Sequence, residues 1–162
     1  MKERTFLEIT RLSAVELQWK RRFSASVASV FKALTTPDLV QQWLTGPPGM
    51  TMPICEIDLR VGGRFRYVWQ RPDGKEMGMG GEFKELSPPN RIVHTELFDE
   101  DWTGGETVVT TTLAEQDGGT LLTCTVRYSS RSARDAALRT GMGDGVAHSY
   151  AQLDTFLAGR QP

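Results

Sequence analysis

Aromatic and polar residues alternate in one short stretch of the chain, and this alternation is the clearest signal of its fold. Phe65, Tyr67 and Trp69 occupy every second position, and Arg64 and Arg66 stand between them. Successive side chains of a β-strand point to opposite faces of a sheet, so the pattern predicts a strand with an aromatic inner face and a solvated outer face. A long C-terminal helix is the only segment expected to be large enough to cover the aromatic face.

Similar alternation recurs along the chain, and turn residues separate the segments. The turn segments are Pro72-Asp73-Gly74, Pro88-Pro89-Asn90 and Asp117-Gly118-Gly119. In tight turns proline fixes φ and lacks an N–H donor, and glycine tolerates positive φ. Such turns join neighbouring strands, which predicts an antiparallel sheet. The predicted strands are residues 14–24, with 3–10 as an extension of this first strand, and then 52–60, 63–70, 76–86, 91–99, 106–115 and 120–129.

Two short helices are predicted directly after the first strand. Ser26 is a candidate N-cap for a helix that runs to Leu34. Pro37 followed by Asp38 suits the first turn of the next helix, because proline gives up no hydrogen bond there and a carboxylate favours the positive end of the helix. Trp43 falls on the apolar face of this second helix, so we expect it to point at the sheet.

The C-terminal segment, residues 132–159, predicts one long amphipathic helix. Its apolar residues recur at steps of three and four positions. Gly141, Gly143 and Gly145 fall inside it and cost about 1 kcal/mol each relative to alanine, which indicates a bend or a close approach of another segment. A run of strands set apart from the helices indicates the α+β class.

Composition and charge place the chain among ordinary globular domains. It has 162 residues, of which 39% are hydrophobic, and a formal net charge of -1, so we expect a single domain over residues 1–162. No basic excess favours nucleic acid or an acidic membrane as a partner. The apolar runs are short and no signal-peptide pattern is present, which predicts a cytoplasmic protein. Cys55 and Cys124 fall in predicted strands and are expected to be free thiols.

Several short motifs occur in an order that resembles a known family. They are Val30–Leu39 with Gln42-Trp43, Gly62–Phe65, Pro72–Lys75, Gly81–Phe83, Pro88–Val93, Gly119–Thr123 and Thr140–Met142 with Gly145. Together they resemble the helix-grip, START-like or SRPBCC superfamily, which includes birch-pollen-allergen-like proteins, and within it the family of homologues of the activator of the heat-shock-protein-90 ATPase. The resemblance implies a seven-stranded antiparallel sheet curved around a long C-terminal helix. It also implies a cavity between them, which binds lipids, hormones or polyketide-like molecules in many relatives.

The aromatic strand face and the C-terminal helix supply the predicted ligand-binding residues. Ligand pockets are largely apolar with a few placed polar groups, and methionine adapts to irregular shapes. The alternative interpretation is that these side chains only fill the core. The predicted ligand-binding residues are Trp43, Phe65, Tyr67, Trp69, Met77, Met79, Met142, Val146 and Tyr150.

His94 and Glu96 are the candidate catalytic residues, because they share one face of the strand 91–99. An imidazole beside a carboxylate can act as a general base. Neither face of this strand is cleanly apolar, so the pair either faces the cavity or forms a half-exposed structural pair. His148 and Ser149 are adjacent on a helix and point about 100° apart, which argues against a nucleophilic dyad.

The remaining patterns narrow the function without fixing it. No residue spacing fits a metal site, and the glycines of residues 78–81 lie in a strand instead of opening a helix, so we expect no cofactor. The acidic loop 99–105 carries Trp102 at a rim of the cavity, where it would gate entry or make a homodimer contact. We therefore predict binding of a small hydrophobic or amphipathic ligand, and nothing requires catalysis. A cyclase- or hydrolase-like enzyme and a co-chaperone-like interaction module are the two alternatives.

Overall fold

The structure is a computed structural model that describes residues 7–100 and 104–160. Its strands are β1 (Ile9–Arg11), β2 (Glu16–Phe23), β3 (Thr51–Ile57), β4 (Arg64–Gln70), β5 (Glu76–Ser87), β6 (Arg91–Phe98), β7 (Thr107–Gln116) and β8 (Gly119–Arg127). Its helices are α1 (Val27–Thr35), α2 (Pro37–Trp43), α3 (Arg131–Arg139) and α4 (Met142–Arg160). The described strands form one antiparallel sheet in the order β1-β2-β8-β7-β6-β5-β4-β3.

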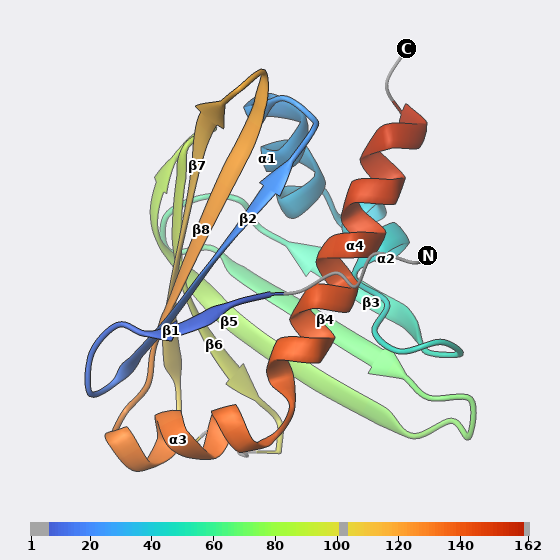
Figure 1. Ribbon diagram of the computed structural model, residues 1–162. Coiled ribbons are helices and arrows are strands. Elements are labelled where there is room, and N and C mark those ends of the chain that lie inside the picture. Colours follow the sequence, from blue (N-terminus) through green and yellow to red (C-terminus); the bar gives the residue numbers. More distant parts are fainter. Residues whose placement is uncertain (1–6, 101–103, 161–162) are drawn as a thin grey trace, which may run out of the picture.

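The sheet curves around α4, which crosses its open side (Figure 1). α1 and α2 contact α4 and close one end of this arrangement, while α3 lies at the other end. This is the α+β helix-grip fold that the sequence predicts. The N-cap predicted for the first short helix is also present, because the Ser26 hydroxyl accepts a hydrogen bond from the Ser29 amide at 3.2 Å.

The first predicted strand is a two-stranded hairpin instead, which gives the described sheet eight strands where we predicted seven. Ile9 of β1 lies opposite Trp19 of β2. The chain reverses between them because the Ser13 hydroxyl accepts a hydrogen bond from the Val15 amide two residues later, and the Leu12 amide donates to the carbonyl of Glu16. The predicted extension of the first strand is thus a separate edge strand.

The predicted C-terminal helix is also divided, because Gly141 adopts φ +77° between α3 and α4. α3 begins at Arg131, one residue before the predicted start at residue 132, and the Ser130 hydroxyl accepts from the Ala133 amide as its N-cap. Gly143 lies close to another segment, because a Cβ there would lie 2.9 Å from Cδ1 of Ile9. The glycines therefore mark both a bend and a close approach, as their cost in a helix indicated.

Two features of the β5–β6 pair bend the sheet locally. A Cβ on Gly81 would lie 1.8 Å from the backbone oxygen of Thr95, so only glycine lets the two strands approach this closely. The register between the strands also shifts between Phe83 and Glu85, as in a β-bulge. This bend turns the inner face of the sheet around α4.

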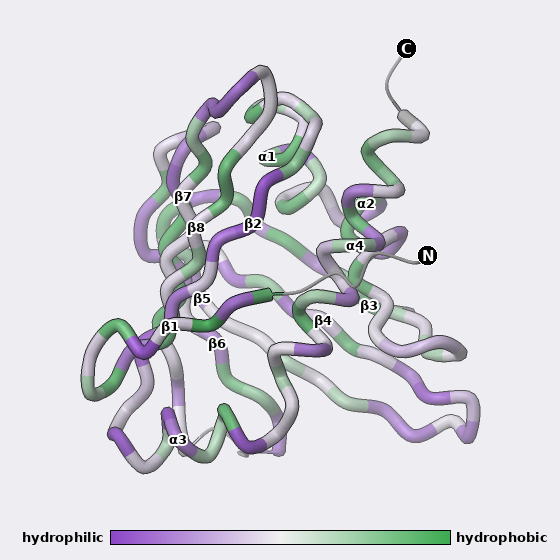
Figure 2. Tube along the Cα trace, in the orientation of Figure 1, coloured by the Kyte–Doolittle hydropathy of each residue, from purple (hydrophilic) through white to green (hydrophobic). Residues whose placement is uncertain are grey.

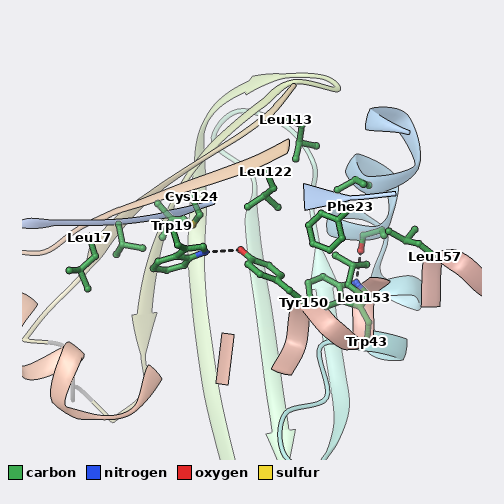
Figure 3. Packing of buried hydrophobic residues seen from close by; sticks show 14 of the residues in the cluster. Leu17, Trp19, Phe23, Trp43, Leu113, Leu122, Cys124, Tyr150, Leu153 and Leu157 are labelled. Carbon is green, nitrogen blue, oxygen red and sulfur yellow. Dashed lines mark hydrogen bonds between the residues drawn. The ribbon is translucent and has the colours of Figure 1, made fainter. Parts of the chain in front are cut away.

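α4 is held against the sheet by a buried core that Figure 3 shows from close by. Leu153 is fully buried, and the ring of Tyr150 meets Phe23 edge-on at 5.6 Å between centroids. The indole nitrogen of Trp19 donates to the Tyr150 hydroxyl at 3.0 Å, which ties the middle of α4 to β2 (Figure 3). These contacts fix the distance between the helix and the inner face of the sheet.

The polar segments lie away from this core. The tip of the hairpin between β4 and β5 is hydrophilic, as Figure 2 shows.

Among the described helices, none has both the length and the apolar character that a membrane span requires.

Candidate functional site

A cavity of about 440 Å³ lies between the inner face of the sheet and α4. Strands β4, β6, β7 and β8 form its floor, and α2, the segment from Leu44 to Met50 and the first half of α4 form its other walls. Ligand pockets in proteins commonly measure about 300–1,000 Å³. The space is therefore large enough for a small organic molecule.

The aromatic face of β4 lines this cavity, and the alternation of β4 is as predicted. Phe65, Tyr67 and Trp69 all face inward, with ring centroids 5.0 Å apart between the first two and 5.9 Å between the last two. On the outer face, Arg66 donates two hydrogen bonds, of 2.8 and 2.6 Å, to the carboxylate of Asp99.

Three tryptophans line the cavity with their indole N–H groups already bonded elsewhere. Trp43 donates to the carbonyl of Ala33 at 2.9 Å and Trp69 to the carbonyl of Leu44 at 2.8 Å. Trp19 donates to Tyr150, as described above. These side chains consequently present apolar ring surface to the cavity, and Trp43 points at the sheet as expected.

Residues of α4 and one methionine of β5 complete the apolar wall near the opening. Met142, Val146 and Tyr150 line the cavity from the helix. Met77 also lines it and is 42% exposed, which places it at the mouth. Met79 is not among the lining residues, and it packs in the same apolar cluster as Phe65.

His94 and Glu96 face the cavity, which settles the orientation that the sequence left open. Nε2 of His94 lies 3.0 Å from Oε2 of Glu96, and the two side chains are 16% and 27% exposed. The imidazole packs edge-on against the ring of Phe65 at 5.2 Å. Its Nδ1 is buried and has no hydrogen-bond partner among the described residues.

Three tyrosine hydroxyls and one thiol of the cavity wall are influenced by the charge of Glu96. Burial, and to a lesser extent the negative charge of Glu96, raises the pKa of Tyr128 to about 12 and that of the Cys124 thiol to about 12. Burial also raises the pKa of Tyr67 and Tyr150 well above its usual range. All four groups stay neutral at physiological pH, so their O–H and S–H groups remain donors.

Three further sequence predictions have different outcomes. Ser149 lines the cavity and is buried, whereas His148 is exposed on the helix, so the two side chains do not converge. Trp102 lies outside the described residues. Cys55 and Cys124 are free thiols, as expected.

The wall formed by β7 and β8 was missed by the sequence interpretation. Its inward residues include Thr107, Val109 and Thr111 of β7 and Cys124 and Val126 of β8. Their period of two was visible in the sequence. The residues are small or polar, however, and so did not resemble a ligand-binding surface. No group of three or more His, Cys, Asp or Glu side chains in residues 7–100 and 104–160 has the arrangement of a metal site.

Comparison with known proteins identifies the family. The family model described as activator of Hsp90 ATPase homolog 1-like protein matches residues 24–158. The crystal structure of a protein from Rhodobacter sphaeroides is 38% identical over 95% of this chain and 99% of that chain, with a TM-score of 0.90. One from Nitrosomonas europaea is 25% identical over 94% and 100% of the two chains, with a TM-score of 0.81.

An AHSA1-like protein from Aeromonas hydrophila, solved by solution NMR, shares the fold at 20% identity, with a TM-score of 0.73 over 90% of this chain and 95% of that one. The search of curated proteins gives no match. Both the matched range and the structural likeness agree with the resemblance seen in the sequence. The chain belongs to the family of activator of Hsp90 ATPase homolog 1-like proteins, with the SRPBCC fold.

Proposed function

We propose that this protein binds a small hydrophobic or amphipathic molecule in the cavity between the sheet and α4. The cavity of about 440 Å³, with its mostly apolar wall, is the observation that carries this proposal. Protein interiors are close-packed and contain few voids larger than a water molecule. A ligand that filled this space would gain about 25 cal/mol for each Å² of apolar surface removed from water.

Fixed side chains support a preformed cavity instead of one that collapses. The indole N–H groups of Trp19, Trp43 and Trp69 are all bonded within the protein, to Tyr150 and to two backbone carbonyls. Rotating any of these rings into the empty space would break a hydrogen bond in a largely buried setting, at a cost of about 1–3 kcal/mol. A site held open in this way loses little conformational entropy on binding.

The opening has the properties of a ligand entry. Met77 of β5, Gly145 of α4 and Pro47 after α2 line the cavity and are exposed, which places the mouth among these three segments. Methionine can change rotamer at low cost to admit molecules of different shape. The ligand would therefore enter between the helix and the hairpin of β4 and β5.

The decisive experiment is native mass spectrometry of the protein purified from its own host, followed by extraction and identification of any bound molecule. A titration with the neutral dye Nile red complements it, since the dye brightens in apolar surroundings. We expect either a co-purified apolar molecule or saturable binding of the dye at one site. An empty protein that binds neither the dye nor a panel of lipids and polyketides would refute the proposal.

Acid–base catalysis in the same cavity is the second candidate, and the inward-facing His94–Glu96 pair favours it. Glu96 can orient the His94 ring by accepting from Nε2–H at 3.0 Å, which leaves Nδ1 as the atom that would accept a proton from a bound carbonyl compound or a water once the ring turns to expose it. This describes a cyclase- or hydrolase-like reaction. His94→Ala would then abolish turnover of the co-purified molecule and leave its affinity within about threefold. A wild-type protein that leaves that molecule unchanged would rule this candidate out.

The interaction-module alternative predicts a dry, filled core and an exposed patch around Trp102. The cavity argues against the first part of this prediction. The patch lies outside the described residues. A stable complex with a chaperone that is insensitive to ligand would be needed to revive this alternative.

A further inference from the structure

The charged side chains that line the cavity favour negative over positive charge. Glu96 is the only acidic side chain among the described lining residues, and none of these residues is a lysine or an arginine. His94, the remaining group that can carry a positive charge, already bonds to Glu96. The described wall therefore offers a carboxylate to a ligand and has no independent cation.

Glu96 has the capacity to accept further hydrogen bonds. A carboxylate has about four acceptor sites, and the described contact with His94 uses one of them. The side chain is 27% exposed although its neighbours in the cavity are mostly buried, so part of the carboxylate is accessible to a bound molecule. Thr107 donates to the backbone carbonyl of Glu96 at 3.4 Å, and not to the carboxylate.

Donors of the protein line the same cavity as this acceptor. The Tyr150 oxygen accepts from Trp19, which leaves the phenolic hydrogen of Tyr150 for another partner. A ligand hydroxyl can donate to Glu96 and can also accept from a donor of the wall. An amine donates to Glu96 and adds a favourable charge. A ligand carboxylate can only accept, and it would bring a second negative charge next to Glu96 in a poorly solvated space.

From this arrangement we infer that the natural ligand carries a hydrogen-bond donor, a hydroxyl or an amine, at the polar end that meets Glu96, and that the cavity discriminates against carboxylates such as fatty acids. The inference rests on the proposed binding function. It adds the chemical class of the head group, which the apolar wall alone does not specify.

A series of probes with the same apolar chain tests the head group. The probes are decanol, decylamine, decyltrimethylammonium and decanoate, at about pH 7.5, where the amine is protonated and the acid ionised. Binding is followed by tryptophan fluorescence, because Trp19, Trp43 and Trp69 line the cavity. We expect decanol and decylamine to bind at least about tenfold more tightly than decanoate. Decyltrimethylammonium has charge but no donor, and we expect it to bind at least about threefold more weakly than decylamine.

Two variants assign the discrimination to Glu96. Glu96→Gln keeps an acceptor oxygen and removes the charge, so the preference for decanol over decanoate should fall to less than about threefold. Glu115→Gln removes the same charge at the exposed end of β7, outside the cavity, and should leave the preference unchanged.

Three outcomes would overturn the inference. Decanoate that binds the wild type as tightly as decanol, or a preference that survives in Glu96→Gln, would mean that Glu96 does not select the head group. Equal affinities of decylamine and decyltrimethylammonium would mean that charge is recognised without donation. In these cases the proposed binding function still stands, provided that Nile red binds. Failure of the dye and of all four probes would refute the binding function together with the inference.

Discussion

Replacing Gly145 with leucine separates binding from stability more sharply than any other single change. Gly145 lies in α4, lines the cavity and is exposed at its mouth. A Cβ built on this residue has nothing within 4 Å, so the first atom of a new side chain is accommodated without a clash. Its methyl groups would occupy space that a ligand needs to enter and to fill the cavity.

Two opposing effects of this substitution can be estimated from the structure. Glycine inside a helix costs about 0.8–1 kcal/mol, so leucine should raise the free energy of unfolding by nearly that amount and Tm by about 2–4 °C. A ligand that gives up contacts comparable to one buried leucine side chain loses about 1.5–3 kcal/mol, which lowers its affinity by about 10- to 150-fold. The variant should therefore be more stable and bind more weakly.

Thermal unfolding and Nile red titration measure the two effects, and Gly159→Leu is the matched control. Gly159 also lies in α4 with nothing within 4 Å of a Cβ, but it does not line the cavity. Its substitution should leave dye affinity unchanged. Equal affinities of the two variants would refute our placement of the ligand beside α4. A Tm well below that of the wild type for Gly145→Leu would refute the claim that the mouth is open.

Three further changes test the packing around the site. Trp19→Phe removes the donor to the Tyr150 hydroxyl and should lower the free energy of unfolding, measured by urea denaturation, by about 1–3 kcal/mol. An unchanged value would mean that this hydrogen bond does not hold α4 against the sheet. Gly81→Ala places a Cβ 1.8 Å from the Thr95 carbonyl oxygen and should lower the free energy of unfolding by more than about 3 kcal/mol, or prevent folding. Circular dichroism measures this, and a melting curve like that of the wild type would contradict the close approach of β5 and β6. Burial raises the pKa of Cys124 from its ordinary 9.0 to about 12. The thiol therefore loses its proton at lower pH in the unfolded chain than in the folded protein, and the free energy of unfolding should fall as pH rises from 9.0 to about 12. Cys124→Ala should make this fall less steep.

The elements of the fold were readable from the sequence because each depends on local signals. Alternation gave β4, and proline and glycine turns gave its neighbours. The errors arose where one residue changes the course of the chain. Ser13 folds an expected continuous strand into the hairpin of β1 and β2, and Gly141 divides an expected single helix into α3 and α4. Neither event alters the hydrophobic period on which the predictions rested.

The orientation of the His94–Glu96 pair could not be predicted, for a reason particular to β6. A period of two shows which residues share a face but not which face is inward, and a slip of one residue exchanges the faces. One face of β6 carries Ile92 beside His94 and Glu96, and the other alternates Val93 and Leu97 with a polar residue, so hydrophobicity does not distinguish them. The register of β6 with β5 and β7 and the packing of the sheet against α4 determine which face is inward.

The cavity itself arises from residue size on the wall that sequence interpretation overlooked. Large aromatic side chains crowd β4, and by themselves they would fill a core. Opposite α4, however, the inward positions of β7 and β8 hold Val109, Thr111 and Cys124, and α4 presents Val146 and Ser149 toward the same space. Because Trp19 and Tyr150 fix the distance between helix and sheet, these short side chains cannot meet across it. The empty volume therefore follows from a rigid frame lined by small residues, while the aromatic face determines what kind of molecule would occupy it.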